Sequence, residues 1–270
     1  MINSIRTSTS RDRIAKLLRE SSSIISVEHC ASILEIKRDA ASRCLSQWVK
    51  QGWFKRIKQG FYAPIPADSI SDKQVLEDVW VAVPALFSPS YVGGWSAAEY
   101  WGFTEQVFNS ICVITSKSIR ARSEKIQDQT FQLKKTNHKN FFGLKILWKG
   151  SVKINISDPH KTIADILDDP NLGGGISHVE KCLIDYLKSQ HFNQELLLSY
   201  LKDIGNKTAF KRLGFLLEGI DEKKYSSAIK FCQKNISKGD SKLDTKYQDL
   251  KLATKWKLWI PKNWSKFSND

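Results

Sequence analysis

The spacing of apolar residues over the first 66 positions predicts three short helices followed by a β-hairpin. Ser10 is placed to cap the first helix, in which apolar residues at i, i+3 and i+4 form one face. Ser26 is placed to cap a second, shorter helix. A third helix is expected from about Arg38 to Gln51, because Gly52 is a favourable residue just beyond a helix end.

The pattern then changes to that of two short strands, at residues 53–57 and 61–65. Gly60 lies in the turn between them and can adopt a positive φ. The side chains expected to pack back on the helices are Trp53, Ile57 and Phe61. Three helices followed by a hairpin are the order of a winged helix-turn-helix domain, and we expect its boundary at residue 66.

The third helix has two different sides when its residues are placed at 100° intervals. Ala41, Leu45, Trp48 and Val49 gather on the inner side. The outer side carries groups that can reach phosphates and base edges, as a recognition helix does. The residues expected to contact double-stranded DNA are Lys37, Arg38, Ala40, Arg43, Gln47 and Lys50 from the helix, and Lys55, Arg56, Lys58 and Gln59 from the exposed tip of the hairpin.

Residues 67–270 combine a β-rich stretch with a helical second half. Helices are expected at residues 72–87, with Ser71 as the N-cap, and at 93–103. Strands are expected at 110–116, 130–136, 144–150 and 152–157, and further helices at 158–170, 176–190, 193–205, 208–220 and 223–235. The predicted fold class is α+β, with a winged helix-turn-helix followed by a mixed domain that has a small β-sheet and a helical C-terminal half.

The net charge of +14 is concentrated at the two ends of the chain. Residues 1–66 hold 12 Lys and Arg against 5 Asp and Glu, and residues 221–270 hold 12 against 6. Residues 67–220 are almost neutral, with 18 against 17. Basic ends of this kind indicate a polyanionic partner, and nucleic acid is favoured over a membrane or an acidic protein.

Cysteine usage and hydropathy indicate a cytoplasmic protein. Five scattered cysteines without a CxxC pair are typical of reduced, buried thiols. The first residues lack the apolar run of a signal peptide. No stretch approaches the ~18 apolar residues of a membrane span, so we expect no membrane partner.

The sequence contains no pattern typical of catalysis or metal binding. Its five histidines lack HxxxH, HxH and HExxH spacing. Asp158, followed by proline, is the expected N-cap of a helix, on which His160 and Asp165 lie about 140° apart. Residues 168–169 are expected to face solvent, and the glycines at 173–175 are interpreted as a helix entry in place of a phosphate loop. We expect no enzyme activity, no cofactor and no metal.

Two cationic features of the later half have alternative interpretations. Lys211 and Arg212 lie at the edge of an apolar helix; we favour an internal pairing with a carboxylate such as Asp158 or Asp165 over a surface that faces a toxin or RNA. The lysine-rich tail interleaves Trp256, Trp259 and Trp264. Stacking of single-stranded nucleic acid on these rings is one interpretation, and packing of "WKLWIP" as a strand or arm is the favoured one.

Several segments of the chain resemble the AbiEi family of bacterial antitoxins, which belong to type IV toxin–antitoxin systems of abortive infection. The matching segments, in the family's order, are "GWFKRIKQGFYAP", "SAAEYWG", "ISDPHKTIADILDDPNLGGGISHV", "KRLGFLLE" and "KWKLWIP". They span most of residues 10–260. The combination of "DPHKTIADIL", "GGGI" and "KRLGFLLE" is the specific part of the resemblance.

The resemblance implies a protein with two functions. Residues 1–66 would bind inverted repeats at the protein's own promoter and repress it, which requires two copies on the DNA. Residues 67–270, as an AbiEi-like antitoxin domain, would counter a nucleotidyltransferase-type toxin without a stable complex, and Lys211 and Arg212 are its candidate residues. The alternatives are a module that faces a protein or RNA, and a solitary winged-helix regulator without a toxin.

Overall fold

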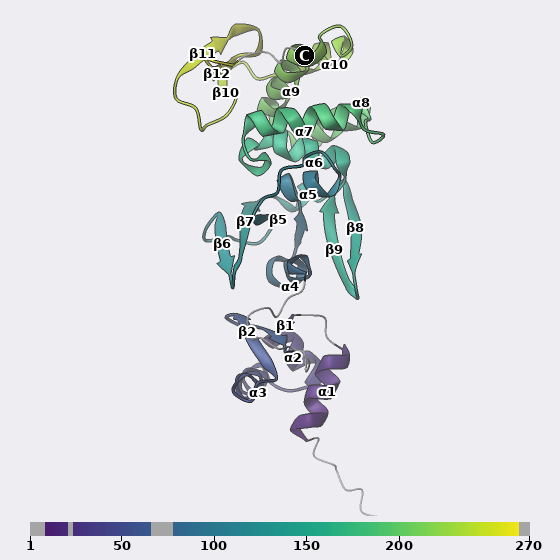
Figure 1. Ribbon diagram of the computed structural model, residues 1–270, viewed down its shortest axis with the longest axis vertical. Coiled ribbons are helices and arrows are strands. Elements are labelled where there is room, and N and C mark those ends of the chain that lie inside the picture. The colour runs from purple at the N-terminus through teal and green to yellow at the C-terminus, as the bar shows by residue number, and fades with distance from the viewer. Residues whose placement is uncertain (1–8, 21–23, 66–77, 265–270) are drawn as a thin grey trace, which may run out of the picture.

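The computed structural model describes residues 9–20, 24–65 and 78–264, which form an α+β fold with three sheets. The elements follow one long axis (Figure 1). Helices and a hairpin from the N-terminal part lie at one end, a six-stranded sheet lies in the middle, and helices with the C-terminal strands lie at the other end. The α+β class predicted from the sequence is confirmed.

The N-terminal unit consists of three helices and a three-stranded sheet. Its helices are α1 (Ser10–Glu20), α2 (Val27–Leu34) and α3 (Arg38–Lys50). Its strands are β1 (Ile25–Ser26), β2 (Phe54–Lys58) and β3 (Phe61–Pro64), in the order β1-β3-β2. Ser26 caps α2 as predicted, since its side chain accepts a hydrogen bond from the backbone N–H of His29.

The start of α1 differs from the prediction by one residue. Thr9 Oγ1 accepts a hydrogen bond from the backbone N–H of Asp12 at 3.2 Å, and Thr9 N–H donates to Asp12 Oδ2 at 2.9 Å. These reciprocal bonds make Thr9 the N-cap. The Oγ of Ser10 instead accepts a hydrogen bond of 2.9 Å from the indole of Trp48, which ties α1 to α3.

The β2–β3 hairpin contributes to two hydrophobic cores. Phe54 and Tyr62 are buried in the core of the N-terminal unit, together with residues of all three helices. Ile57 and Ala63 are buried in the core of the middle sheet. The hairpin therefore joins the N-terminal unit to the rest of the described chain.

The prediction that Trp53, Ile57 and Phe61 pack on the three helices is wrong. Trp53 is 46% exposed, and its neighbour Phe54 takes the inner position. Ile57 and Phe61 pack against the core of the middle sheet instead. A shift of one residue in a strand exchanges its two faces, which accounts for Trp53 and Phe54. Ile57 and Phe61 were misplaced because the sequence does not show that both faces of this hairpin are covered.

The middle unit is built on a mixed six-stranded sheet. Its strands are β4 (Ser90–Val92), β5 (Ser110–Thr115), β6 (Ser123–Ile126), β7 (Gln129–Lys135), β8 (Leu144–Lys149) and β9 (Val152–Ser157). They lie in the order β6-β7-β5-β4-β9-β8, with parallel pairing between β5 and β7 and between β4 and β9. Its helical segments are η1 (Val79–Val81), α4 (Ala82–Phe87), α5 (Gly94–Tyr100) and η2 (His138–Asn140).

Alternate residues of the central strands enter different cores. In β5, Ile111 and Val113 face the core shared with α4 and the hairpin, whereas Cys112 and Ile114 face the core shared with the C-terminal helices. Both faces of the sheet are therefore covered, which explains the continuous apolar run of β5. Of the helix predicted at 72–87, residues 72–77 and the cap at Ser71 lie outside the described residues, and the described part ends at Phe87 as expected.

The C-terminal unit contains the five helices that the sequence predicts. They are α6 (Pro159–Asp168), α7 (Ile176–Lys188), α8 (Gln194–Ile204), α9 (Lys207–Asp221) and α10 (Ser226–Asn235), with η3 (Pro170–Gly173) before α7. The C-terminal segment contains β10 (Ser241–Lys242), β11 (Leu250–Ala253), η4 (Thr254–Trp256) and β12 (Leu258–Pro261). Its strands form a sheet in the order β10-β12-β11. The favoured packing of "WKLWIP" is confirmed, because Trp256 is 1% exposed in the helical core.

Candidate nucleic-acid interface

A tight turn between α2 and α3 sets the direction of α3. Glu35 ends α2 in the left-handed conformation, with φ 55°. The N–H of Ile36 then donates to the carbonyl of Ala31 at 3.0 Å, and α3 begins at Arg38. Leu45, which is fully buried, holds the inner side of α3 against the core. This packing leaves the opposite side of α3 to face outward.

The outer side of α3 keeps its cationic residues in contact with solvent. The exposed residues of the predicted set here are Lys37, Arg38, Arg43, Gln47 and Lys50, and Ala40 is half-buried. Arg38 Nε donates to Glu28 Oε1 at 2.9 Å, and this hydrogen bond lowers the pKa of Glu28. Exposed ion pairs hold weakly, so Arg38 can exchange this carboxylate for a phosphate.

The hairpin end of the predicted surface is arranged differently. Arg56 and Gln59 are exposed, and Lys55 is half-buried. Lys58 Nζ forms an ion pair with Glu124 of β6 and lies 5.9 Å from the ring centroid of Phe87. The prediction that Lys58 lies at an exposed tip is therefore wrong, because the middle unit places a carboxylate and an aromatic ring against it.

The predicted DNA-binding residues thus divide into two groups. Phe54, at the start of β2, lies 5.8 Å from the ring of Trp48, so this end of the hairpin is fixed to α3. The turn of the hairpin contacts the middle unit through Lys58. In Figure 1, α3 lies toward the end of the molecule away from the six-stranded sheet, and β2 lies between α3 and α4. The α3 group faces solvent, and the hairpin turn is partly covered.

Other exposed residues of the N-terminal unit were not among the predicted contacts. Arg11 and Arg19 of α1 are exposed and add positive charge to the same unit. From its sequence α1 was expected only to pack on the other helices, whereas Arg11 and Arg19 face away from the buried Leu17. Trp53, after the end of α3, is also exposed. Its exposure could not be found from periodicity, which places it in an apolar strand.

Lys211 and Arg212 are internal, but their partners are not the predicted carboxylates. Lys211 is fully buried and donates to the carbonyl of Gly239 and, at 3.2 Å, to Ser241 Oγ. Arg212 is 7% exposed and donates to the carbonyls of Leu167, Asp168, Lys242 and Leu243 at 2.8 to 3.3 Å. Burial lowers the pKa of both cations.

The arrangement gives Lys211 and Arg212 a role in folding. They join α9 to β10 and to the C-terminal end of α6. The prediction that these cations lie at the edge of their helix is wrong, because the C-terminal segment covers them.

Asp158, His160 and Asp165 of α6 have separate partners inside the protein. Asp158 caps the helix, as predicted, and its Oδ2 accepts a hydrogen bond of 2.9 Å from Tyr200. His160 Nδ1 lies 2.8 Å from the hydroxyl of Tyr186. Asp165 is 6% exposed and pairs with the buried Lys161. Each of the three side chains therefore has a partner of its own within the fold.

Two further predictions about this region have different outcomes. Asp168 and Asp169 do not face solvent; both form ion pairs with Lys134, at 2.7 and 3.4 Å. The glycines before α7 form a helix entry, as favoured. The N–H of Ile176 there donates to Asp244 Oδ2 at 2.9 Å, so a carboxylate of the chain occupies the anion position of this helix end. Within the described residues, no three His, Cys, Asp or Glu side chains are grouped to hold a metal ion.

Comparisons with known proteins show the fold and no family. No family model matches the chain, and no curated protein matches it. Among solved structures, the crystal structure of the RV2827C protein from Mycobacterium tuberculosis is similar, with a TM-score of 0.57 and 16% sequence identity. The match covers 92% of this chain and 89% of that chain. At this identity the similarity concerns the arrangement of elements alone.

None of the described helices is long and apolar enough to cross a lipid bilayer.

Proposed function

We propose that the protein is an antitoxin and transcriptional autorepressor of the AbiEi kind. Its N-terminal unit would act as a winged helix-turn-helix domain that binds promoter DNA, with α3 as the recognition helix. Residues 67–270 would counter a cognate nucleotidyltransferase-type toxin. The protein would work in the cytoplasm as a binding protein, without catalytic activity of its own.

The observation that carries the DNA-binding part is the outer side of α3. Arg43, Gln47 and Lys50 are exposed there, while Leu45 and Trp48 hold the inner side in the core. Arg and Gln side chains can form paired hydrogen bonds with guanine and adenine, respectively. Exposed cations on α1 and on β2 add the charge that phosphate contacts require. The antitoxin part is supported by the sequence segments that resemble the family.

DNA binding is tested with a duplex from the region upstream of the reading frame and a scrambled duplex of equal length. Fluorescence anisotropy at fixed salt should show tighter binding to the upstream duplex. Arg43→Ala should lose most of this preference, because one good base contact contributes ~1–3 kcal/mol of discrimination. Lys223→Ala is the matched control, since Lys223 is exposed in the C-terminal unit, remote from α3.

Two results would contradict this assignment. The first is equal, weak binding of both duplexes by the unaltered protein at low salt. The second is an Arg43→Ala variant that keeps the full preference. Either result would favour a module that faces a protein or RNA.

The antitoxin part is tested by co-expression with a nucleotidyltransferase-type protein encoded beside this reading frame. That protein alone should arrest growth, and the full chain should restore it. Arg43→Ala should restore growth equally well when both proteins are expressed from unrelated promoters, because neutralisation is assigned to residues 67–270. Failure of the unaltered chain to restore growth would leave a solitary regulator as the better interpretation.

A further inference from the structure

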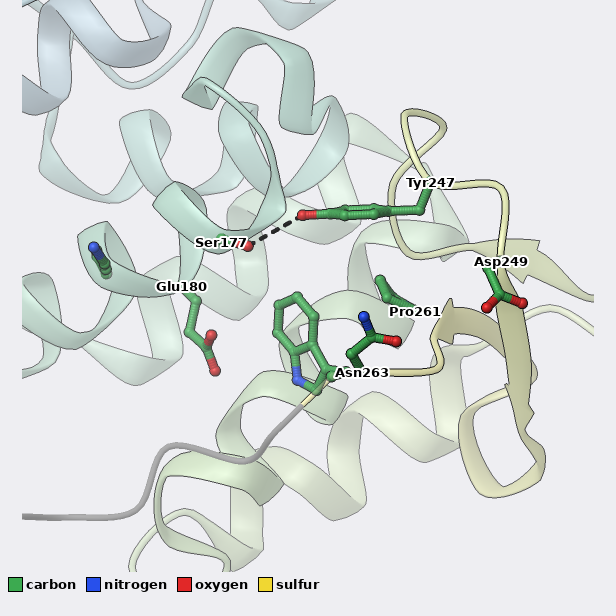
Figure 2. A pocket seen from close by; sticks show the side chains of 8 residues that line it. Ser177, Glu180, Tyr247, Asp249, Pro261 and Asn263 are labelled. Carbon is green, nitrogen blue, oxygen red and sulfur yellow. Dashed lines mark hydrogen bonds between the residues drawn. The ribbon is translucent and has the colours of Figure 1, made fainter.

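A cavity of about 430 Å³ opens between α7 and the C-terminal segment. Figure 2 shows Glu180 extending from α7 on one side, with Tyr247 and Pro261 on the other side. Trp264 also lines the cavity. A space of this size is in the range of small-molecule sites and is far larger than a single water molecule requires.

Glu180 is the unusual residue of this cavity. It is 4% exposed, and it has no hydrogen-bond or ion-pair partner among the residues that the structure describes. Burial raises the pKa of Glu180 to about 7, and no neighbouring charge contributes to the shift. A buried carboxylate without a partner costs free energy, and a hydrogen-bond donor that entered the cavity would offset this cost.

The walls of the cavity carry flat aromatic rings. Tyr247 is held in place by a contact of 3.3 Å between its hydroxyl and Ser177 Oγ (Figure 2). The ring centroid of Trp264 lies 6.0 Å from that of Phe215, and the two rings are tilted against each other. Aromatic faces attract cations, and a planar cation can also stack on them.

Two other charged side chains line the cavity. Asp249 lines it and pairs with Lys262 at 2.6 Å. Lys181, the neighbour of Glu180 on α7, also lines it. Of the two carboxylates that line the cavity, Glu180 is therefore the one without a counterion among the described residues, and it lies beside aromatic side chains.

We propose that this cavity binds a guanidinium group, with Glu180 as its counterion and Trp264 or Tyr247 as its stacking surface. A guanidinium can donate two parallel hydrogen bonds to one carboxylate. It is also planar and more weakly hydrated than an ammonium, so its transfer into an aromatic cavity costs less. The group can belong to a small molecule or to an arginine side chain of a partner protein.

Isothermal titration calorimetry on the full chain tests the proposal with two probes. Agmatine represents a free guanidinium compound, and a capped Ala-Arg-Ala peptide represents a protein side chain. Tighter binding of agmatine points to a small molecule, and tighter binding of the peptide points to a partner protein; either supports the site. The same peptide with citrulline, which is neutral and of equal shape, should bind at least tenfold more weakly.

Glu180→Gln should weaken binding of the preferred probe at least tenfold, whereas Glu195→Gln, on the exposed side of α8, should leave it unchanged. Because a guanidinium selects the ionised carboxylate, affinity should be about tenfold lower at pH 6 than at pH 8. This pH dependence should disappear in Glu180→Gln. That result would assign the titration to Glu180 and not to Lys181, Tyr247 or Asp249, which also line the cavity.

Three results would overturn the proposal. The first is that neither agmatine nor the arginine peptide binds at millimolar concentration, and the second is that the citrulline peptide binds as tightly as the arginine peptide. The third is that guanosine, an aromatic compound without a guanidinium cation, binds more tightly than both probes. DNA binding by the Glu180→Gln variant should match that of the unaltered protein, so this test is independent of the function proposed above.

Discussion

At the scale of single residues, Gly214 shows how packing can reverse an intrinsic preference. Glycine in a helix interior normally costs about 0.5–1 kcal/mol relative to alanine. A Cβ at Gly214 of α9, however, would lie 2.1 Å from a ring carbon of Trp256. The ring is fully buried, and its Nε1 donates to Glu218 Oε2 at 2.5 Å, so it has little freedom to move. Gly219, in the same helix, has nothing within 4 Å of its Cβ position.

These two glycines form a matched pair for a stability measurement. Gly214→Ala should lower the free energy of unfolding by ~1–3 kcal/mol, as overpacked core sites do. Gly219→Ala should raise it by up to ~1 kcal/mol, because helix propensity improves without a clash. Urea unfolding followed by far-UV circular dichroism measures both changes. A Gly214→Ala variant as stable as Gly219→Ala would mean that Trp256 does not pack on this glycine.

At the scale of elements, local patterns were sufficient for most helices. The five helices after Asp158 were predicted because each has an apolar face and an end signal within its own sequence. The cap at Ser26 and the positive φ of Gly60, which is 81°, follow from equally local rules. The two-residue strands β1 and β10 and the short β4 and β6 were not predicted, because segments of two to four residues carry too little periodicity.

The contacts that determine the roles of particular side chains are not local. Arg212 donates to carbonyls that lie up to 45 residues away in the chain, and Asp244 caps a helix that begins 68 residues before it. Their partners depend on how the C-terminal segment folds back over α9. For this reason the sequence indicated that Lys211 and Arg212 are internal, but it could not identify carbonyl oxygens as their partners. The sequence also could not show that Glu180 has no hydrogen-bond or ion-pair partner among the described residues.

At the scale of the whole molecule, the hairpin determines how the proposed DNA-binding surface is oriented. Ile57 and Ala63 are buried in the core of the middle sheet, and Lys58 pairs with Glu124. The Lys58–Glu124 ion pair is partly open to solvent, with side chains 37% and 32% exposed, so it contributes little stability. Each buried apolar side chain contributes more, in proportion to its area. The orientation of α3 relative to the sheet therefore depends mainly on apolar packing. One cation of the hairpin, Lys58, is already paired with a carboxylate of the middle unit.

Salt dependence of DNA binding distinguishes this arrangement from a detached hairpin. The logarithm of the binding constant falls with the logarithm of salt concentration, with a slope of about −0.9 for each phosphate contacted. Arg56→Ala should reduce the magnitude of this slope by about one, because Arg56 is exposed. Lys58→Ala should leave the slope unchanged, because Lys58 is half-buried between Glu124 and the ring of Phe87, unlike the exposed Arg38. If Lys58→Ala reduced the slope as Arg56→Ala does, the hairpin turn would have to leave the middle unit when the protein binds DNA.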